Sequence, residues 1–460
     1  MKNEKLKQRT FAKGFIAPWS IFFAWCIFII PVLFNACEYK NKPGIIYDPS
    51  MVMDTTGKPT ITGFTPAAGA FAGVREIQIN GSNLGLKNGT DTDWVFVGGV
   101  SPLIKEIHDS YITIYRPKLA NDHYNIPISV SVTNMKMPTE SSSASYYVES
   151  PGTITGDYSS NSGASTMLTA TEFDKNENIY VMSVGKNLYK TDSAGVTRTT
   201  ILNSQNMVPS EYASITTIAF GPGSKDKNLF IADGKSNIGR IDVYDTLNRT
   251  GTKSPSPVKL ITPAPVSGLD FDENGNMYVA GNANLYIADT SVGNSTAPTF
   301  NTISGYAGVT NLIKIRIIKE SGSQYIYYAD SLHVWKSQIS GSALVSTSSL
   351  VDLNTHPELT GCKLSSFEVD INGSLFLCLK NHPKYSLFFR EIDGSITPFY
   401  YDQTILPKTV ERIVWGYRKN LYLISGSLQT VPGTYDAGRI YRLVMDRYGA
   451  PYNGRKFIKK

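Results

Sequence analysis

Few side chains in this sequence are of the types and spacing that carry out catalysis or bind metal ions. The five His residues are widely separated along the chain. The His-Glu-x-x-His spacing of metalloproteases, the Walker A phosphate loop and the Gly-x-Ser-x-Gly nucleophile motif are all missing. We therefore predict no enzymatic activity, no metal and no cofactor. A propeller glycosidase or lyase is kept as an alternative, because sequence does not show how far apart two carboxylates lie.

A second group of side chains is suited to holding a polar ligand, with aromatic rings that stack on it and polar groups that bond to its hydroxyls. These residues lie in predicted loops, and their types vary from one loop to the next, as a specific site requires. Ordinary solvated loop residues are the alternative for each of them. The candidate ligand-binding residues are Tyr212, Asp233, Tyr306, Asp330, Lys380, His382 and Arg412.

These loops connect the strands of a repeated unit. One copy reads Phe271-Asp-Glu-Asn-Gly-Asn-Met-Tyr278, and its aromatic residue recurs at spacings of 50, 48, 49, 49 and 46. A period of about 50 residues with several strands in each unit is typical of β-propellers, whose four-stranded blades stack to bury their faces. We therefore predict a six-bladed β-propeller over residues 150–460, with the aromatic anchors Tyr180, Phe230, Tyr278, Tyr327, Phe376 and Tyr422.

The register of the repeat also explains other conspicuous residues. The Asp at the start of each Asp-x-x-Gly-Asn turn recurs at positions 174, 272 and 370, which indicates a turn-forming role. Trp335 and Trp415 occupy positions where other copies have aromatic residues, so we expect both to pack in the scaffold. Copies such as residues 272–289 resemble NHL repeats. The strand that closes the ring comes from residues 151–157 or from residues 456–458.

Residues 58–149 precede the repeat and show short alternating strands broken by Gly and Asn. The stretch Pro59–Gly85, with Pro66-x-x-Gly69 and Gly81-x-Asn83-Leu84-Gly85, resembles the start of an IPT/TIG domain. The resemblance implies an immunoglobulin-like sandwich, so the whole fold is expected to be all-β.

The alternation in this first domain predicts which side chains point outward. If Val95 and Val97 face the core, Trp94 and Phe96 point away from it, and Tyr115 does so on a second strand. Large aromatics on an outer face need an explanation. Trp94, Phe96 and Tyr115 are therefore a possible interface: they cover the seam with the second domain, or they bind a partner or ligand, unless the assumed register is wrong.

The N-terminal segment has the pattern of an export signal. Residues 1–14 are basic, residues 15–36 are apolar and uncharged, and Cys37 follows at once. Phe34-Asn-Ala-Cys37 resembles the lipobox of bacterial lipoproteins. The resemblance implies a signal peptide over residues 1–36, lipidation of Cys37 and a polar spacer over residues 37–57. A retained membrane anchor is the alternative.

Two bulk properties limit the remaining options. The formal charge of the chain is +6; five basic residues and one Glu in the leader account for +4, which leaves about +2. So small a charge does not favour nucleic acid as a partner. Cys362 and Cys378 are predicted to be small buried residues or one disulfide.

The order of leader, Cys37, TIG-like domain and NHL-like propeller resembles Bacteroidetes surface lipoproteins. The resemblance implies an outer-membrane, cell-surface accessory of a SusC/SusD-type uptake system that binds a polysaccharide, an oligosaccharide or a similar nutrient. A protein–protein scaffold that docks on an outer-membrane transporter is the alternative. The ligand, the binding face, the oligomeric state and the leaflet are not determined at this point.

Overall fold

The computed structural model describes the chain between residues 59 and 451. The description excludes residues 86–91, 120–122, 135–136, 150–152, 159–167, 184–186, 203–214, 222–227, 236, 243–257, 263, 282, 290–298, 307–308, 310, 401–409 and 426–437. The predicted leader, Cys37 and the spacer lie outside the described residues. No helix in the described part is long and apolar enough to cross a membrane.

The first folded part, which we name the sandwich, consists of two antiparallel sheets. Alternating residues of both sheets fill its core, and Val95, Val97, Ile112 and Ile114 are all buried. The register predicted from the sequence is therefore confirmed for these strands. One sheet contains β1 (Thr60–Thr65), β2 (Glu76–Ser82), β5 (Tyr111–Tyr115) and β4 (Ile104–Ile107); the other contains β3 (Thr92–Val97), β6 (His123–Asn134) and β7 (Met137–Val148).

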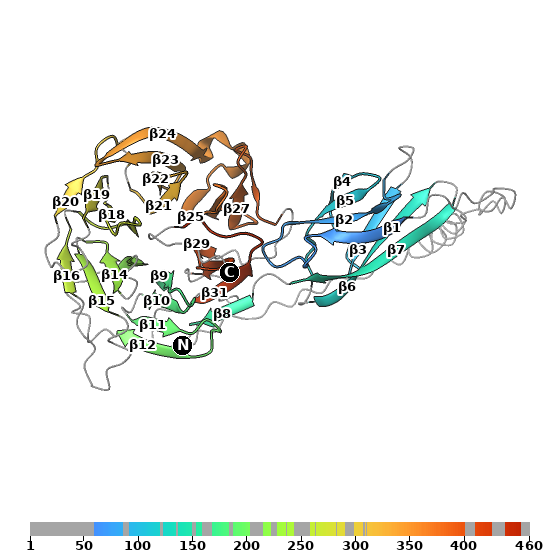
Figure 1. Cartoon of the computed structure of the whole chain (residues 1–460), viewed down its shortest axis with the longest axis horizontal. Coiled ribbons are helices and arrows are strands. Elements are labelled where there is room, and N and C mark those ends of the chain that lie inside the picture. The colour runs from blue at the N-terminus through green and yellow to red at the C-terminus, as the bar shows by residue number, and fades with distance from the viewer. Residues whose placement is uncertain are drawn as a thin grey trace, which may run out of the picture. The chain divides into compact units, whose positions relative to one another are not determined.

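The second folded part, the six-sheet domain, consists of six four-stranded antiparallel sheets arranged around a common axis (Figure 1). Neighbouring first strands contact one another, and each sheet then runs outward. The first strands are β9 (Leu168–Phe173), β13 (Ile215–Phe220), β17 (Gly268–Phe271), β21 (Lys314–Glu320), β25 (Lys363–Val369) and β29 (Val410–Trp415). We number the sheets 1 to 6 in this order.

The other strands follow in the same sheet order. The second strands are β10 (Ile179–Ser183), β14 (Asn228–Asp233), β18 (Met277–Ala280), β22 (Ser323–Ala329), β26 (Leu375–Lys380) and β30 (Asn420–Ser425). The third strands are β11 (Leu188–Thr191), β15 (Asn237–Asp242), β19 (Leu285–Ala288), β23 (His333–Ser340), β27 (Leu387–Arg390) and β31 (Arg439–Val444). The fourth strands are β12 (Arg198–Leu202), β16 (Val258–Ile261), β20 (Phe300–Thr302), β24 (Ala343–Asp352), β28 (Ile396–Pro398) and β8 (Thr153–Asp157). Two 3-10 helices, η4 (Leu353–Thr355) and η5 (Pro357–Leu359), connect sheets 4 and 5.

The fourth strand of sheet 6 comes from the other end of the domain. Strand β8, directly after the sandwich, pairs antiparallel with β31. Of the two segments considered from the sequence, it is therefore residues 151–157 that join sheet 6.

The aromatic anchors of the repeat lie on the second strands and are buried between sheets. Their exposed fractions do not exceed 2%. Trp415 is equally buried and packs against Phe376 with ring centroids 5.1 Å apart. Trp335 is half-buried and stacks on Tyr328. These contacts are those of scaffold residues, as the repeat predicts.

The turn after the first strand is built in the same way in sheets 1 and 3. The Asp174 carboxylate accepts hydrogen bonds from the backbone N–H groups of Asn176 and Asn178, 2.9 and 3.0 Å away. Asp272 accepts the corresponding bonds from Asn274 and Asn276, both at 2.9 Å. These aspartates are therefore fully used in forming the turns.

Sheet 6 has Gly416 where sheets 1, 3 and 5 have an Asp, and Glu177 of sheet 1 supplies the acceptor oxygens instead. The Glu177 carboxylate accepts hydrogen bonds from the Arg418 backbone N–H at 2.7 Å and the Tyr422 hydroxyl at 3.2 Å. The Asn420 side-chain amide donates to it as well. A Cβ at position 416 would lie 2.6 Å from a Glu177 oxygen, so glycine is needed there. The first and last sheets are thereby joined through buried polar contacts.

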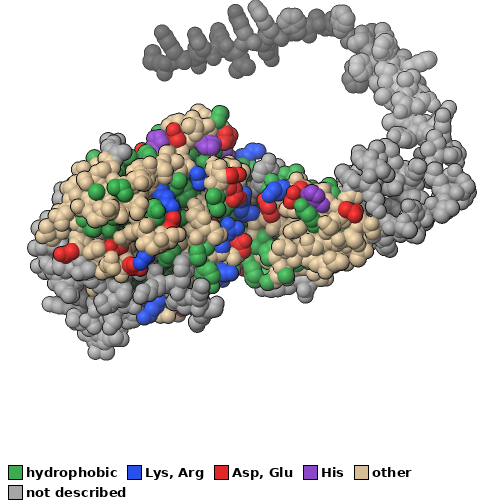
Figure 2. Space-filling view, turned by 45° about the horizontal axis from the view of Figure 1, so that its top comes forward, with side chains coloured by type: hydrophobic (Ala, Val, Ile, Leu, Met, Phe, Trp, Pro, Cys, Tyr) green, Lys and Arg blue, Asp and Glu red, His purple; other side chains and the backbone are tan. Residues whose placement is uncertain are grey.

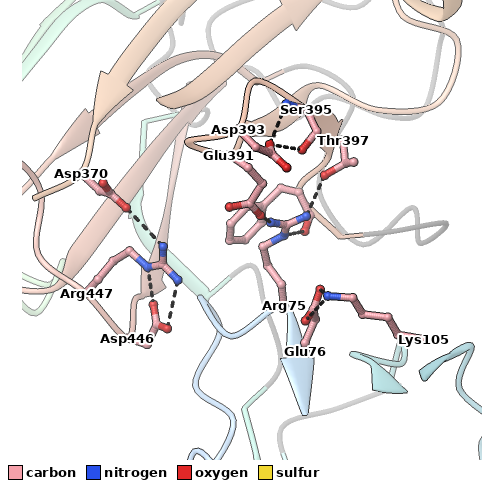
Figure 3. Close-up of polar contacts among 11 residues, drawn as sticks. Arg75, Glu76, Lys105, Asp370, Glu391, Asp393, Ser395, Thr397, Asp446 and Arg447 are labelled. Atoms are coloured by element: carbon pink, nitrogen blue, oxygen red, sulfur yellow. Dashed lines mark hydrogen bonds and ion pairs between the residues drawn. The ribbon is translucent and has the colours of Figure 1, made fainter. Parts of the chain in front are cut away.

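Arg75 makes several of the contacts that join the sandwich to the six-sheet domain (Figure 3). Its guanidinium donates to the Phe399 carbonyl at 2.9 Å, to Thr397 Oγ1 at 2.7 Å and to Glu391 Oε1 at 2.7 Å. The same group stacks over the Phe389 ring. All three nitrogens of the Arg75 guanidinium therefore bond to residues of the six-sheet domain.

Candidate functional site

A cavity of about 450 Å³ lies on the axis of the six-sheet domain. All six first strands contribute to its wall. Ser331 and Lys380, which lie at the ends of second strands, also line it. The cavity therefore opens toward the loops that connect second and third strands.

Lys314 and Arg316 line the inner part of the cavity, and both are bonded to the buried Glu368; we name these three residues the inner charge group. The Glu368 carboxylate is fully buried and accepts bonds from Arg316 Nη2 at 2.6 Å and Lys314 Nζ at 2.8 Å. The Lys314 ammonium also donates to Ser366 Oγ at 3.0 Å and the Ile413 carbonyl at 2.8 Å. All three protons of this ammonium therefore have acceptors.

Burial and neighbouring charges shift the titration of the inner charge group. Burial, followed by the charge of Arg316, lowers the pKa of Lys314 to about 8. Burial alone would raise the pKa of Glu368, but Arg316 and Lys314 outweigh it and hold that pKa below its ordinary value. Glu368 is thus an ionised anchor for two cations.

The outer part of the cavity holds Lys363, Lys380, Glu411 and Arg412. Lys363 and Lys380 are paired across β25 and β26, and Lys380 Nζ lies 3.4 Å from Glu411 Oε1. The structure therefore brings together Lys380 and Arg412, two of the residues predicted to bind a ligand. Burial lowers the pKa of the Arg412 guanidinium.

Two other predicted ligand-binding residues lie in a separate cluster on sheet 4. Tyr306 packs on Tyr328 with centroids 5.4 Å apart, and its hydroxyl donates to the Val309 carbonyl. Asp330 accepts bonds from the backbone N–H groups of Leu332 and His333, both at 2.7 Å. These bonds hold the loop between β22 and β23 in shape.

Two of the remaining three candidates, Asp233 and His382, are described by the structure. Asp233 is fully buried and accepts a bond from the Lys235 backbone N–H. His382 Nδ1 accepts bonds from the N–H groups of Lys384 and Tyr385, and burial, then Lys384, lowers its pKa. Tyr212 lies outside the described residues.

The possible interface of the sandwich is described in part. Phe96 and Tyr115 are half-buried, and the side chain of Trp94 lies outside the described residues. The exposed apolar residues of the sandwich include Val100 and Leu103. Cys362 and Cys378 are both free and buried, so the alternative of a disulfide between them is wrong.

Lys314, Arg316 and Glu368 were not predicted from the sequence. A signal was present, because these charged residues alternate with or adjoin apolar residues of the first strands. A charge in a buried strand is costly unless it is paired.

Charges on the surface are mixed. On the face shown in Figure 2, basic and acidic side chains are interspersed and much of the surface is uncharged. Nucleic acids are bound by continuous basic surfaces, and this face does not offer one.

Comparison with known families identifies the first domain. Residues 59–148 match the profile of the IPT/TIG domain family. This part of the chain is an IPT/TIG domain. The match ends before β8, so it does not cover the six-sheet domain, and no curated protein matches the chain.

Solved structures with similar folds include proteins of different functions. An auxiliary nutrient-binding protein from Bacteroides thetaiotaomicron is 12% identical, with a TM-score of 0.45, over 86% of this chain and 98% of that one. A luciferin-regenerating enzyme is 13% identical, with a TM-score of 0.44, over 64% and 97%. The β-propeller domain of Cps50 (Swd1) from Myceliophteria thermophila is 10% identical, with a TM-score of 0.39, over 72% and 98%. These likenesses do not decide the function.

Proposed function

We propose that this chain is a non-catalytic binding protein whose six sheets form a closed six-bladed β-propeller and whose axial cavity binds a glycan or similar nutrient. The observation that carries the proposal is the cavity itself. Its volume of about 450 Å³ falls within the range of about 300–1,000 Å³ found for small-molecule sites.

The described walls of the cavity carry no aromatic ring, but they offer apolar surface and hydrogen-bonding groups to a sugar. Apolar residues such as Leu269 and Leu364 alternate with hydroxyl side chains such as Thr217. Lys363, Lys380 and Arg412 supply donors near the opening. One bound sugar unit would meet both apolar surface and hydrogen-bonding groups.

The carboxylates near the cavity support binding over catalysis. A general acid in a glycosidase needs a raised pKa. The pKa of Glu368 is instead held low by two cations. Glu411 is paired with Lys380, and the Glu172 carboxylate accepts a bond from the Phe173 N–H. These acids are committed to structural contacts.

The proposed location follows from the leader. The lipobox-like sequence before Cys37 supports a lipid anchor, and the TIG domain, followed by a propeller, supports a cell-surface protein of the outer membrane. In this setting the chain would act as an accessory of a SusC/SusD-type transporter. The Bacteroides structure named as an auxiliary nutrient-binding protein prompts a test of that role.

Affinity gel electrophoresis tests this function. The purified full chain in detergent would be run through gels that each contain one polysaccharide, and released reducing sugar would be assayed in parallel. Retardation by a glycan without sugar release supports the proposal. Sugar release would indicate an enzyme, and no retardation by any glycan would contradict glycan binding.

A scaffold role is the second candidate. The exposed side chains of Val100 and Leu103, 40% and 46% accessible, lie on the TIG domain that also carries the half-buried Phe96 and Tyr115. Apolar surface of this kind favours a protein partner. Co-purification of an outer-membrane protein that is lost in a Leu103→Glu variant would support this role.

A further inference from the structure

We propose that the axial cavity recognises an acidic group of its ligand, a carboxylate or sulfate carried by a sugar, and that Arg412 is the residue that binds it. This inference rests on the proposed glycan-binding function and specifies the class of glycan.

Arg412 lies in the wall of the cavity. Within the described part of the chain, its guanidinium has neither a hydrogen bond nor an ion pair, although it lines the cavity. A guanidinium carries five N–H donors, and Arg412 is half-buried. An arriving anion would accept hydrogen bonds from donors that the described chain leaves unused.

The other cations of the cavity wall differ from Arg412 in their partners or in their exposure. Lys314 and Arg316 are bonded to Glu368, and Lys380 is paired with Glu411. Lys363 is exposed to solvent. Arg412 is therefore the cation in the described cavity wall that is half-buried and has no bonding partner among the described residues.

The cavity wall carries more positive than negative charges. The wall contains five cations, Lys314, Arg316, Lys363, Lys380 and Arg412, against the two acids Glu172 and Glu411. Glu368, bonded to the wall, adds one further negative charge. Five positive and three negative charges leave a net charge of +2, which attracts an anion into a site of low dielectric.

The chemistry of arginine narrows the ligand. Its planar donors match the paired oxygens of a carboxylate or a sulfate, and such bidentate bonds are among the strongest in proteins. Uronic acids carry the first group and sulfated sugars the second.

The test uses matched pairs of polysaccharides with the purified full chain in detergent. The carboxylate pair is polygalacturonate and its methyl ester, and the sulfate pair is dextran sulfate and dextran. We expect the acidic member of one pair to bind at least about tenfold more tightly, the effect of one charge-assisted bond. Which pair responds identifies the acidic group.

Variants assign the effect to the cavity. Arg412→Gln should weaken binding of the acidic member at least about tenfold more than it weakens binding of the neutral member. Arg412→Lys should restore part of the affinity. Lys384→Gln, which removes an exposed cation in the loop after Lys380 that is not part of the cavity wall, should bind as the unchanged chain does.

Two results would overturn the inference. If a neutral glycan binds as tightly as its acidic partner and Arg412→Gln has no effect, the acid-specific site is wrong while glycan binding stands. If none of the polysaccharides binds, the inference and the proposed function both fail.

Discussion

The axial cavity contains paired and unpaired cations, and this difference separates scaffold from site. In the inner charge group, Lys314 and Arg316 share the Glu368 carboxylate, and the Lys314 ammonium is fully bonded. Arg412, toward the opening, has no such partner among the described residues. The bonds of the inner charge group join three sheets, whereas the unpaired guanidinium of Arg412 in the same cavity is available to a ligand.

The largest effect is expected on removing the shared anion. Glu368→Gln leaves Lys314 and Arg316 buried without a counter-charge, so we expect a loss of about 3–5 kcal/mol in the free energy of unfolding. Arg412→Gln should change that free energy by less than about 1 kcal/mol. Urea denaturation measures both, and equal losses would contradict the division of the cavity into two parts.

A second, smaller loss is expected at the contact between the first and last sheets. Glu177→Ala removes the acceptor of three hydrogen bonds to the sheet 6 turn, and we expect a loss of about 3 kcal/mol. The control is Glu273→Ala in the corresponding turn of sheet 3, where the exposed ion pair with Lys319 contributes less than about 1 kcal/mol. Similar thermal midpoints for the two variants would argue against the role given to Glu177.

A third prediction concerns the pH dependence of Lys314. Its pKa is lowered to about 8 in the folded chain, whereas an unfolded lysine titrates near 10.4. Between these values the unfolded chain binds more protons, so the contribution of Lys314 to stability rises with pH.

The unchanged chain should therefore gain stability over a Lys314→Met variant between about pH 7.5 and pH 9, by about 1 kcal/mol. Urea unfolding at the two pH values gives this difference. A constant difference would show that Lys314 does not titrate in this range.

The smallest effect is expected where paired charges are partly exposed. Glu391, whose carboxylate forms an ion pair with Arg75 between the sandwich and the six-sheet domain, has a side chain that is 44% exposed. Glu391→Gln should lower the free energy of unfolding by less than about 1 kcal/mol. A loss as large as that of Glu368→Gln would mean that burial does not control the value of these ion pairs.

The sequence was sufficient to predict local features. The period of the aromatic anchors predicted six units, and the alternation around Val95 and Ile112 predicted which faces are buried. The turn aspartates were recognised because their role depends only on residues a few positions away.

Features that join distant segments were not predicted. Glu177 accepts hydrogen bonds from a turn about 240 residues later in the chain, and no local sequence pattern predicts this contact. Lys314 and Glu368 lie on different sheets and pair only once those sheets are packed. Arg412 was selected as a loop residue, but only the fold shows that it faces the cavity.

Filling the axial cavity with a large side chain tests most directly whether the cavity holds the ligand. Thr217 lines the cavity, and no hydrogen bond of its side chain is found among the described residues, so Thr217→Trp would occupy the space. Thr200→Trp places the same ring on the exposed outer strand β12. With both variants folded, isothermal titration with the glycan that retards the chain should show binding lost in Thr217→Trp and kept in Thr200→Trp. Equal binding by the two variants would contradict the account.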